Sequence, residues 1–176
     1  VVSAPTNGVY AGSIYTPNLN YNGPDRITFK VNDGTLDSSV ETVNISVLSV
    51  NDAPVLGAVA VAVAEDTTVS FTPALFTTQY SDLENDPFTS LTVATLPPTG
   101  LLTWGGVPVA VGQVISVADL GALAYTPALN ENGAKTFTVR ASDSFSLSLP
   151  TTVTVVIGGV NDAPALTAFS KGLNED

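Results

Sequence analysis

The stretch ETVNISVLSVNDAP at residues 41–54 decides the fold, because it contains both a strand pattern and the start of a repeat. Val43, Ile45 and Val47 alternate with polar side chains, and this period of two is typical of a β-strand with one buried face. The stretch TTVTVVIGGVNDAP at residues 151–164 has the same layout 110 positions later. A repeat built from β-strands is therefore the first expectation for this chain.

The repeat extends well beyond these two stretches. Residues 15–66 align without a gap to residues 125–176, and 21 of the 52 aligned positions are identical. Both segments begin with Tyr-Thr-Pro and end with Glu-Asp. The alignment predicts the C-terminal part of one repeat at residues 1–52, a complete repeat at residues 53–162 and the start of a third repeat at residues 163–176.

Short strand patterns separated by Gly, Pro, Asn and Asp continue through the complete repeat. Further strands are expected at residues 59–64, 67–72, 89–96, 101–104 and 113–117. No segment shows a helical period, and about seven short strands in roughly 100 residues indicate an immunoglobulin-like sandwich. The predicted class is therefore all-β, with β-sandwich repeats in tandem. The complete repeat is longer than the first one ahead of its Tyr-Thr-Pro motif, so an extra hairpin is expected around Trp104.

The composition excludes several kinds of function. Without Cys and His, the chain has no disulfide framework, no Cys zinc site and no Ser-His-Asp triad. A net charge of −11 makes nucleic acid an unsuitable partner, and no apolar run is long enough to insert into a membrane. The chain lacks a signal peptide and an initiator Met, so we expect a mature piece or an excised segment of a longer protein. The absence of Cys fits an extracellular bacterial protein.

The acidic residues gather at a few loop positions, while the polar faces of the strands are mostly Ser and Thr. Like charges clustered in loops repel one another unless a cation neutralises them. Carboxylate and amide oxygens are the ligands of Ca²⁺, so the sequence predicts calcium as the bound ion. The clustered acids are Asp33, Asp52, Glu65, Asp66, Asp82, Glu84, Asp86, Asp143, Asp162, Glu175 and Asp176.

The segment Asp82-Leu83-Glu84-Asn85-Asp86 places acids at alternate positions, so that three side chains can turn toward one ion. The segment is not an EF-hand, because Pro87 stands where that loop needs Gly and Val93 where it needs a bidentate Glu. A solvated acidic turn is the alternative interpretation.

The other acidic positions also leave two interpretations open. Asn-Asp-Ala-Pro at residues 51–54 and 161–164 is a stiff linker, since Pro keeps the preceding Ala extended, or a pair of ion ligands at a domain junction, or both. Glu65-Asp66 is either a polar bulge between strands or part of a site. Asp33 and Asp143, each at the end of a strand, are either ligands or turn-initiating residues.

These residues resemble bacterial cadherin-like tandem repeats, which occur in large surface adhesins of the VCBS and RTX types. The resemblance rests on Tyr-Thr-Pro at residues 15–17, on ITFKVNDG at residues 27–34 and on Asn-Asp-Ala-Pro, and it covers essentially the whole chain. It implies immunoglobulin/cadherin-like β-sandwiches with calcium between successive domains. The linker is shorter than that of animal cadherins, so fewer ions are expected at each junction.

The resemblance also implies the ligands of two junctions. The junction between the first and second repeats would use Asn51, Asp52 and Asp143, together with Asp82, Glu84 or Asp86 as the paired acids. The junction between the second and third repeats would use Glu65, Asp66, Asn161 and Asp162.

The function implied is that of a calcium-binding extender repeat of a bacterial adhesin, secreted or at the cell surface, with junctions stiffened by Ca²⁺. Its partners would be calcium and the neighbouring repeats. The alternative is a module that binds polysaccharide or another cell-surface protein, including homophilic cell–cell binding, with Trp104, Tyr80 and Tyr125 as candidates for stacking on sugars. We do not expect an enzyme, because acids that recur with the repeat fit junctions better than a unique active site.

Overall fold

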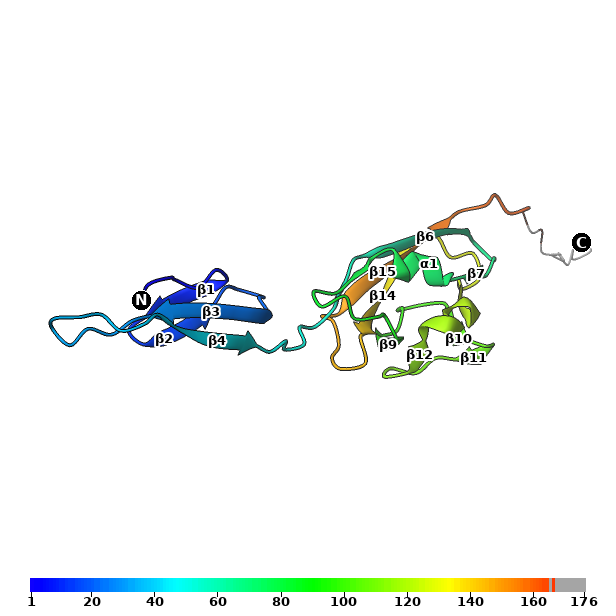
Figure 1. Cartoon of the computed structure of the whole chain (residues 1–176). Helices are drawn as coiled ribbons and strands as arrows, with labels where there is room; N and C mark the ends of the chain where they lie inside the picture. Colours follow the sequence, from blue (N-terminus) through cyan, green and yellow to red (C-terminus); the bar gives the residue numbers. More distant parts are fainter. Residues whose placement is uncertain (165, 167–176) are drawn as a thin grey trace, which may run out of the picture. The chain divides into compact units, whose positions relative to one another are not determined.

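The computed structural model describes residues 1–164 and 166 and divides into two compact units, Val1–Asn51 and Asp52–Asp176 (Figure 1). The described residues are mostly β-strand with two short helices, so the predicted all-β class is confirmed. The predicted start of a third repeat at residues 163–176, including Glu175 and Asp176, lies outside the described residues except for 163, 164 and 166.

The first unit consists of two antiparallel hairpins. These pair β1 (Gly8–Ala11) with β2 (Ile14–Pro17), and β3 (Gly23–Phe29) with β4 (Glu41–Val47). Within residues 1–51, all of which the structure describes, Ile27 is the only large apolar side chain that is buried, whereas Leu19 and Val50 are at least 80% exposed. This unit therefore has almost no apolar core of its own.

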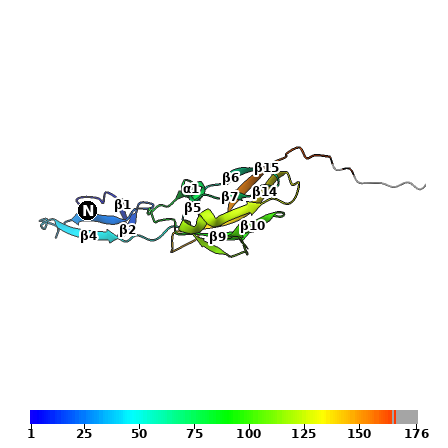
Figure 2. The same cartoon turned by 90° about the vertical axis from the view of Figure 1, so that its right-hand side faces the viewer.

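The second unit is a two-layer sandwich, whose larger sheet can be followed in Figure 2. In spatial order this sheet contains β12 (Val114–Ser116), β9 (Ser90–Thr95), β14 (Gly133–Ser142), β15 (Thr151–Gly158) and β6 (Val59–Ala64). The smaller sheet contains β11 (Val107–Pro108), β10 (Leu101–Trp104), β13 (Leu123–Thr126) and β7 (Val69–Ser70). All pairs are antiparallel except β15 with β6. A separate short ladder joins β5 (Val55–Leu56) to β8 (Tyr80–Ser81).

The apolar core lies between the two sheets. Phe137 on β14 meets Phe71, which follows β7, edge to face with ring centroids 5.7 Å apart. Val153, Val155 and Ile157 on β15 are all buried, as their period of two predicts. Full burial of one such side chain contributes about 1.5–3 kcal/mol to folding, so this alternation stabilises the sandwich.

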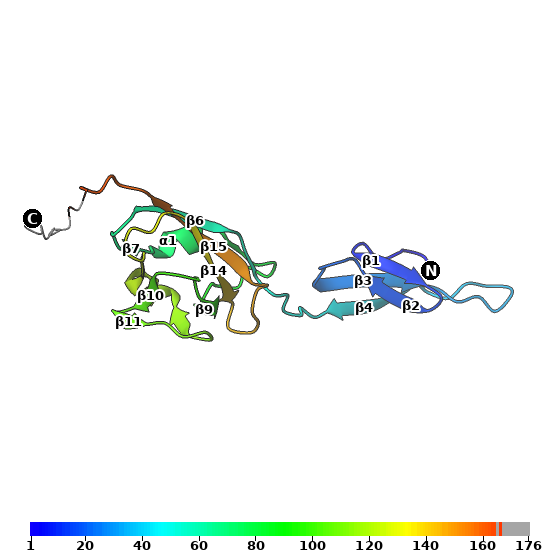
Figure 3. The ribbon, with the colours of Figure 1, turned by 180° about the vertical axis from the view of Figure 1, so that it is seen from behind.

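Two short helices depart from the sequence expectation that no segment is helical. Helix α1 (Pro73–Thr77), which lies beside β6 (Figure 3), begins at Pro and buries Phe76. The 3₁₀ helix η1 (Val117–Ala122) buries Leu120. Both are too short for an apolar period to repeat, so the pattern cannot reveal them. The strand expected at residues 67–72 is reduced to β7, because α1 begins directly after it.

The extra hairpin predicted in the second repeat is present. Gly105 and Gly106 join β10 to β11 and both have positive φ, at 58° and 81°, as a tight two-residue hairpin turn requires. In the first unit, Gly12 and Ser13 close β1 directly onto β2 with φ of 57° and 66°. The insertion therefore adds β11, β12 and η1 to the second repeat.

Candidate metal centre

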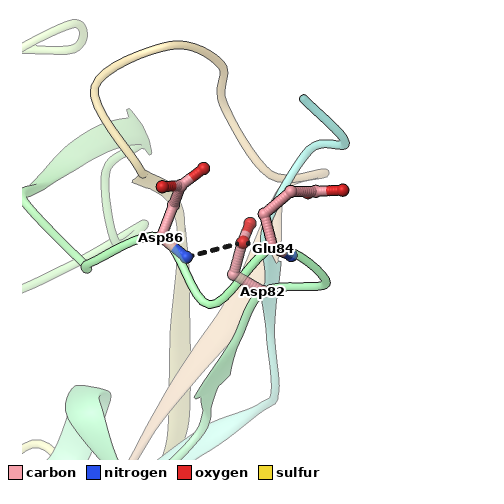
Figure 4. Close-up of side chains that lie close together, drawn as sticks. All are labelled: Asp82, Glu84 and Asp86. Carbon is pink, nitrogen blue, oxygen red and sulfur yellow. Dashed lines mark hydrogen bonds between the residues drawn. The ribbon is translucent and has the colours of Figure 1, made fainter. Parts of the chain in front are cut away.

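Three acidic side chains meet in the loop that follows β8 (Figure 4). One carboxylate oxygen from each of Asp82, Glu84 and Asp86 lies within 4.8 Å of the other two, and all three residues are half-buried. Two negative charges about 4 Å apart repel each other by about 1 kcal/mol in water and about 4 kcal/mol near a protein surface. The cluster therefore favours a bound cation.

Asp82 organises this loop. Its Oδ1 accepts hydrogen bonds from the backbone N–H groups of Glu84 and Asp86, each at 2.9 Å, and Asn85 between them has a positive φ of 64°. Asp and Asn are common in tight turns of this kind. The Asp side chain accepts hydrogen bonds from backbone N–H groups a few residues further on, and Asn tolerates a positive φ. The alternating acids are thereby brought to one side of the loop.

The second oxygen of Asp82 tests whether the cluster fits a metal. Asp82 Oδ2 is buried and has no hydrogen-bond partner within the described part of the chain. A buried polar atom without a partner costs about 1–3 kcal/mol, so such an atom calls for an ion or a water molecule. Three carboxylates with one unsatisfied buried oxygen match the ligand chemistry of Ca²⁺.

An aromatic pair forms the floor beneath the acidic loop. The rings of Tyr80 and Phe88 stack with centroids 4.9 Å apart, and the Tyr80 hydroxyl donates to the carbonyl of Asp86 at 3.0 Å. Burial, followed by the charges of Asp82, Asp143 and Asp86, raises the pKa of Tyr80 to about 12. A cavity of about 400 Å³ opens beside this pair. Tyr80 thus supports the acidic loop through its stacked ring and its hydroxyl.

Asp143 lies near the acidic loop but serves a turn of its own. It is 1% exposed, and its Oδ1 accepts from the N–H groups of Phe145 and Ser146 at 2.6 Å each. Its Oδ2 accepts from the Ser146 hydroxyl at 2.9 Å. Asp33 makes the same turn in the first unit, with bonds from two backbone N–H groups at 2.9 and 3.0 Å. Both residues therefore form turns of this kind, and Asp143 is not one of the three acids whose oxygens lie close together.

The chain enters the second unit at this acidic loop. The backbone N–H of Asp52 donates to Oε2 of Glu84 at 3.1 Å, so the first residue of the unit is hydrogen-bonded to the cluster. Asn51 belongs to the first unit. Asp52, one of the two linker residues proposed as ligands for this junction, is thus hydrogen-bonded to the acidic loop.

Glu65 lies at the opposite end of the second unit, after β6. It is only 7% exposed, and its Oε1 accepts a hydrogen bond from the N–H of Val160, the residue before the second Asn-Asp-Ala-Pro motif. Asp66, with a positive φ of 58°, accepts from the N–H of Asn130 at 2.9 Å. Glu65 is therefore a buried side chain whose carboxylate is hydrogen-bonded to the backbone just after β15.

Asn161 and Asp162 follow directly and are exposed. The side-chain amide of Asn161 donates to the carbonyl of Asp162 at 3.4 Å. Among residues 1–164 and 166, the group at Asp82 is the only set of three acids with mutually close oxygens, so Glu65, Asp66 and Asp162 do not form one. In the same part of the chain, no helix has the length and apolar character needed to cross a membrane.

The chain contains two β-domains in tandem, and the second has an acidic loop at the end where the chain enters it. These features are those of structural repeat domains. Residues 51–159 match the model of the bacterial cadherin-like domain, and residues 1–46 match that of the bacterial Ig domain. The chain belongs to the bacterial cadherin-like domain family, which confirms the resemblance seen in the sequence. Both matched families consist of structural domains and not of catalytic ones.

The solved structures that are similar to the chain include a protocadherin and a glycoside hydrolase. The human mucin-like protocadherin EC1-2 is 18% identical with a TM-score of 0.42, and the match covers 89% of this chain and 80% of that one. An endo-fucoidan hydrolase from glycoside hydrolase family 107 is 18% identical with a TM-score of 0.35, and the match covers 81% of this chain and 20% of that one. No curated protein is significantly similar to the chain.

Proposed function

We propose that this chain is an extender segment of a bacterial surface adhesin, secreted or held at the cell surface, in which calcium stiffens the ends of cadherin-like domains. The family supports a role as a structural repeat. The observation that carries the calcium proposal is the buried, unpartnered Oδ2 of Asp82 within a group of three half-buried acids. Neighbouring repeats of the same protein are then its first partners.

Asp82, Glu84 and Asp86 would hold the ion through carboxylate oxygens. The ion supplies the positive charge that cancels their mutual repulsion. Glu84 also accepts the N–H of Asp52, so a Glu84 side chain fixed by an ion fixes the start of the linker as well. This coupling of the cluster to the linker is the physical basis of the proposed stiffening.

Further ligands are proposed on the resemblance. At the same end these are Asn51, Asp52 and Asp143; at the other end they are Glu65, Asp66, Asn161 and Asp162. Extracellular calcium sites work with a Kd of about 10⁻⁴ to 10⁻³ M, which corresponds to about 4–6 kcal/mol. One such ion is enough to restrict a short linker.

Calorimetric titration of the full chain with calcium tests the site. We expect saturable binding, weakened at least about tenfold in Glu84→Gln and in Asp86→Asn. Both changes remove a charge but keep the size of the side chain and leave the two hydrogen bonds of Asp82 Oδ1 in place. Glu41→Gln, at an exposed acid of the first unit, is the matched control and should bind as the parent does. Absence of calcium binding at 10-millimolar levels (on the order of ten times the expected Kd) would contradict the proposal.

Small-angle scattering tests the stiffening itself. The full chain is measured in calcium and in chelator, and we expect a narrower distribution of maximal lengths in calcium. Asp86→Asn should show the broader distribution in both conditions. A calcium-saturated chain with the same distribution as the chelated one would leave a metal site without the proposed mechanical role.

A further inference from the structure

The insertion that distinguishes the second repeat carries a cavity of its own. The cavity measures about 420 Å³ and is lined by Trp104, Gly105, Val107, Gln113, Asp119 and Ala122. Trp104 ends β10, Gln113 directly precedes β12, and Asp119 lies in η1. Since β11 and β12 are edge strands of different sheets, the cavity sits between the open edges of the sandwich.

The walls combine an indole with polar side chains. The Nε1–H of Trp104 donates to the carbonyl of Asp119 at 3.3 Å, so the polar group of the indole is engaged. The half-buried ring packs partly on the apolar core, and the rest of its carbon surface is what it offers to a ligand. The Ser116 hydroxyl bonds to Oδ2 of Asp119 at 2.8 Å and orients this exposed carboxylate. Gln113 adds an amide, whose Nε2 donates to the carbonyl of Val114 at 3.2 Å and keeps a second N–H, beside the acceptor oxygen, for a ligand.

We infer that this cavity binds one ring of a neutral glycan. A pyranose ring has C–H groups that pack on an aromatic surface and hydroxyls that bond to carboxylates and amides. A volume of about 420 Å³ lies in the range of small-molecule sites. The net charge of −11 and the carboxylate of Asp119 disfavour uronate and sulfated sugars, so charge selects the neutral class.

The site is confined to the second repeat and is independent of the proposed calcium centre. In the first unit, the turn at Gly12 and Ser13 replaces the whole insertion, so no counterpart of Trp104 and Asp119 exists there. The cavity shares no lining residue with the three-acid group. Sugar binding is therefore expected in chelator as well as in calcium.

The chain contains a single Trp, so its fluorescence reports directly on this cavity. We expect a saturable change in the emission of the full chain on titration with neutral oligosaccharides of glucose, galactose or mannose, and none with oligogalacturonate. A flat response to the whole neutral panel, with no heat by calorimetry, overturns the inference. Binding of oligogalacturonate alone overturns the assignment to neutral sugars. Because the titrations are run in chelator, their outcome is separate from that of the calcium proposal.

Variants then assign the binding to these side chains. Asp119→Ala and Gln113→Ala should each weaken binding of the best neutral oligosaccharide by up to about tenfold, the effect of one lost hydrogen bond. Trp104→Phe, followed by calorimetry, should also weaken it while the melting temperature shows that the fold persists. Glu41→Gln is the matched control and should bind as the parent does. Unchanged affinity in all three cavity variants overturns the inference.

Discussion

The hydroxyl of Tyr125 donates a hydrogen bond to Oε2 of Glu131 at 3.1 Å, and Tyr15 makes the equivalent bond to Oδ2 of Asp25 at 3.0 Å. Both tyrosines begin a Tyr-Thr-Pro motif, 110 positions apart. Tyr125 is fully buried, which excludes it from stacking on sugars. The repeated tyrosine is therefore an internal hydrogen-bond donor to a carboxylate in each repeat.

The carboxylate partner comes from different positions in the two repeats. Asp25 aligns with Lys135, whereas Glu131 aligns with Tyr21. In the second repeat Lys135 instead pairs with Glu131, with Nζ 3.1 Å from Oε1. The same environment of the tyrosine is thus reached by different residues, which an alignment of the repeats does not reveal.

Tyr125→Phe tests this pair. The change removes the hydroxyl that faces two acceptors, Oε2 of Glu131 and the carbonyl oxygen of Thr99, each at 3.1 Å. Because it removes a hydrogen bond to a charged carboxylate, we expect the free energy of unfolding to fall by about 1–3 kcal/mol in urea denaturation followed by Trp104 fluorescence. Tyr10→Phe, at a hydroxyl with no hydrogen bond in the first unit, should change it by less than about 0.5 kcal/mol. Equal stability of the Tyr125 variant and the parent would contradict this role.

The same carboxylate predicts a dependence of stability on pH. Hydrogen bonds from the Thr99 hydroxyl first, and then from the Ala128 N–H, Lys135 and Tyr125, lower the pKa of Glu131 from 4.5 to about 2. A carboxyl with a depressed pKa stabilises the folded state above its unfolded pKa and loses that contribution as the pH falls through the folded value.

We therefore expect Glu131 to contribute stability at pH 7 that is lost between about pH 5 and pH 2. Urea denaturation at a series of pH values measures it, with Glu131→Gln compared against Glu41→Gln. The Glu131 variant should be less stable than the parent at pH 7 and should approach it at the acidic end. Parallel pH curves for the parent and both variants would show that Glu131 has no such effect.

Several positions that the two repeats share have a specific role in the conformation of the backbone, and this helps to explain why the alignment predicted the fold. Asn20 and Asn130 have positive φ of 59° and 54°, a conformation that Asn tolerates better than most residues. Ser38 and Ser148 each accept a backbone N–H, at 3.0 and 2.9 Å, in the loop after the strand. Identities at such positions reflect backbone geometry.

The alternating strands were also predictable, and residues 59–64 and 101–104 match β6 and β10. The short helices were not, because their single turns leave no period. For the site, the spacing of Asp82, Glu84 and Asp86 indicated the cluster. The buried Oδ2 and the supporting stack of Tyr80 on Phe88 depend on tertiary packing, which a local spacing cannot report.

Asp82 has two roles that substitutions can separate: its Oδ1 accepts hydrogen bonds that hold the loop, and its charge contributes to the proposed calcium site. Asp82→Asn keeps an Oδ1 acceptor for the two backbone N–H groups, whereas Asp82→Ala removes it. In chelator we expect the Asn variant to match or exceed the parent in thermal stability, because it relieves repulsion, and the Ala variant to be less stable by about 1–3 kcal/mol.

Calcium should reverse this order. At ten times its Kd, calcium stabilises a protein with one site by about 1.4 kcal/mol, so the parent should gain this amount and neither variant should. Calorimetric melting in chelator and in calcium measures all six conditions. A calcium-induced gain in the Asn variant equal to that of the parent would place the ion elsewhere.

Gly100 allows the tyrosine to lie against the backbone. Its φ is +71°, and a Cβ added there would lie 2.3 Å from the Tyr125 hydroxyl oxygen and 2.7 Å from the carbonyl oxygen of Thr126. Gly8 has the same relation to Tyr15, with a Cβ 2.6 Å from the ring. Gly100→Ala must therefore displace Tyr125 or the strand, and we expect it to destabilise the second unit by at least about 2 kcal/mol.

Gly121→Ala is the matched control, because open space surrounds its Cβ and its φ is not positive. Thermal melts of the two variants that coincide would show that the close approach of Tyr125 to the backbone is not required for stability.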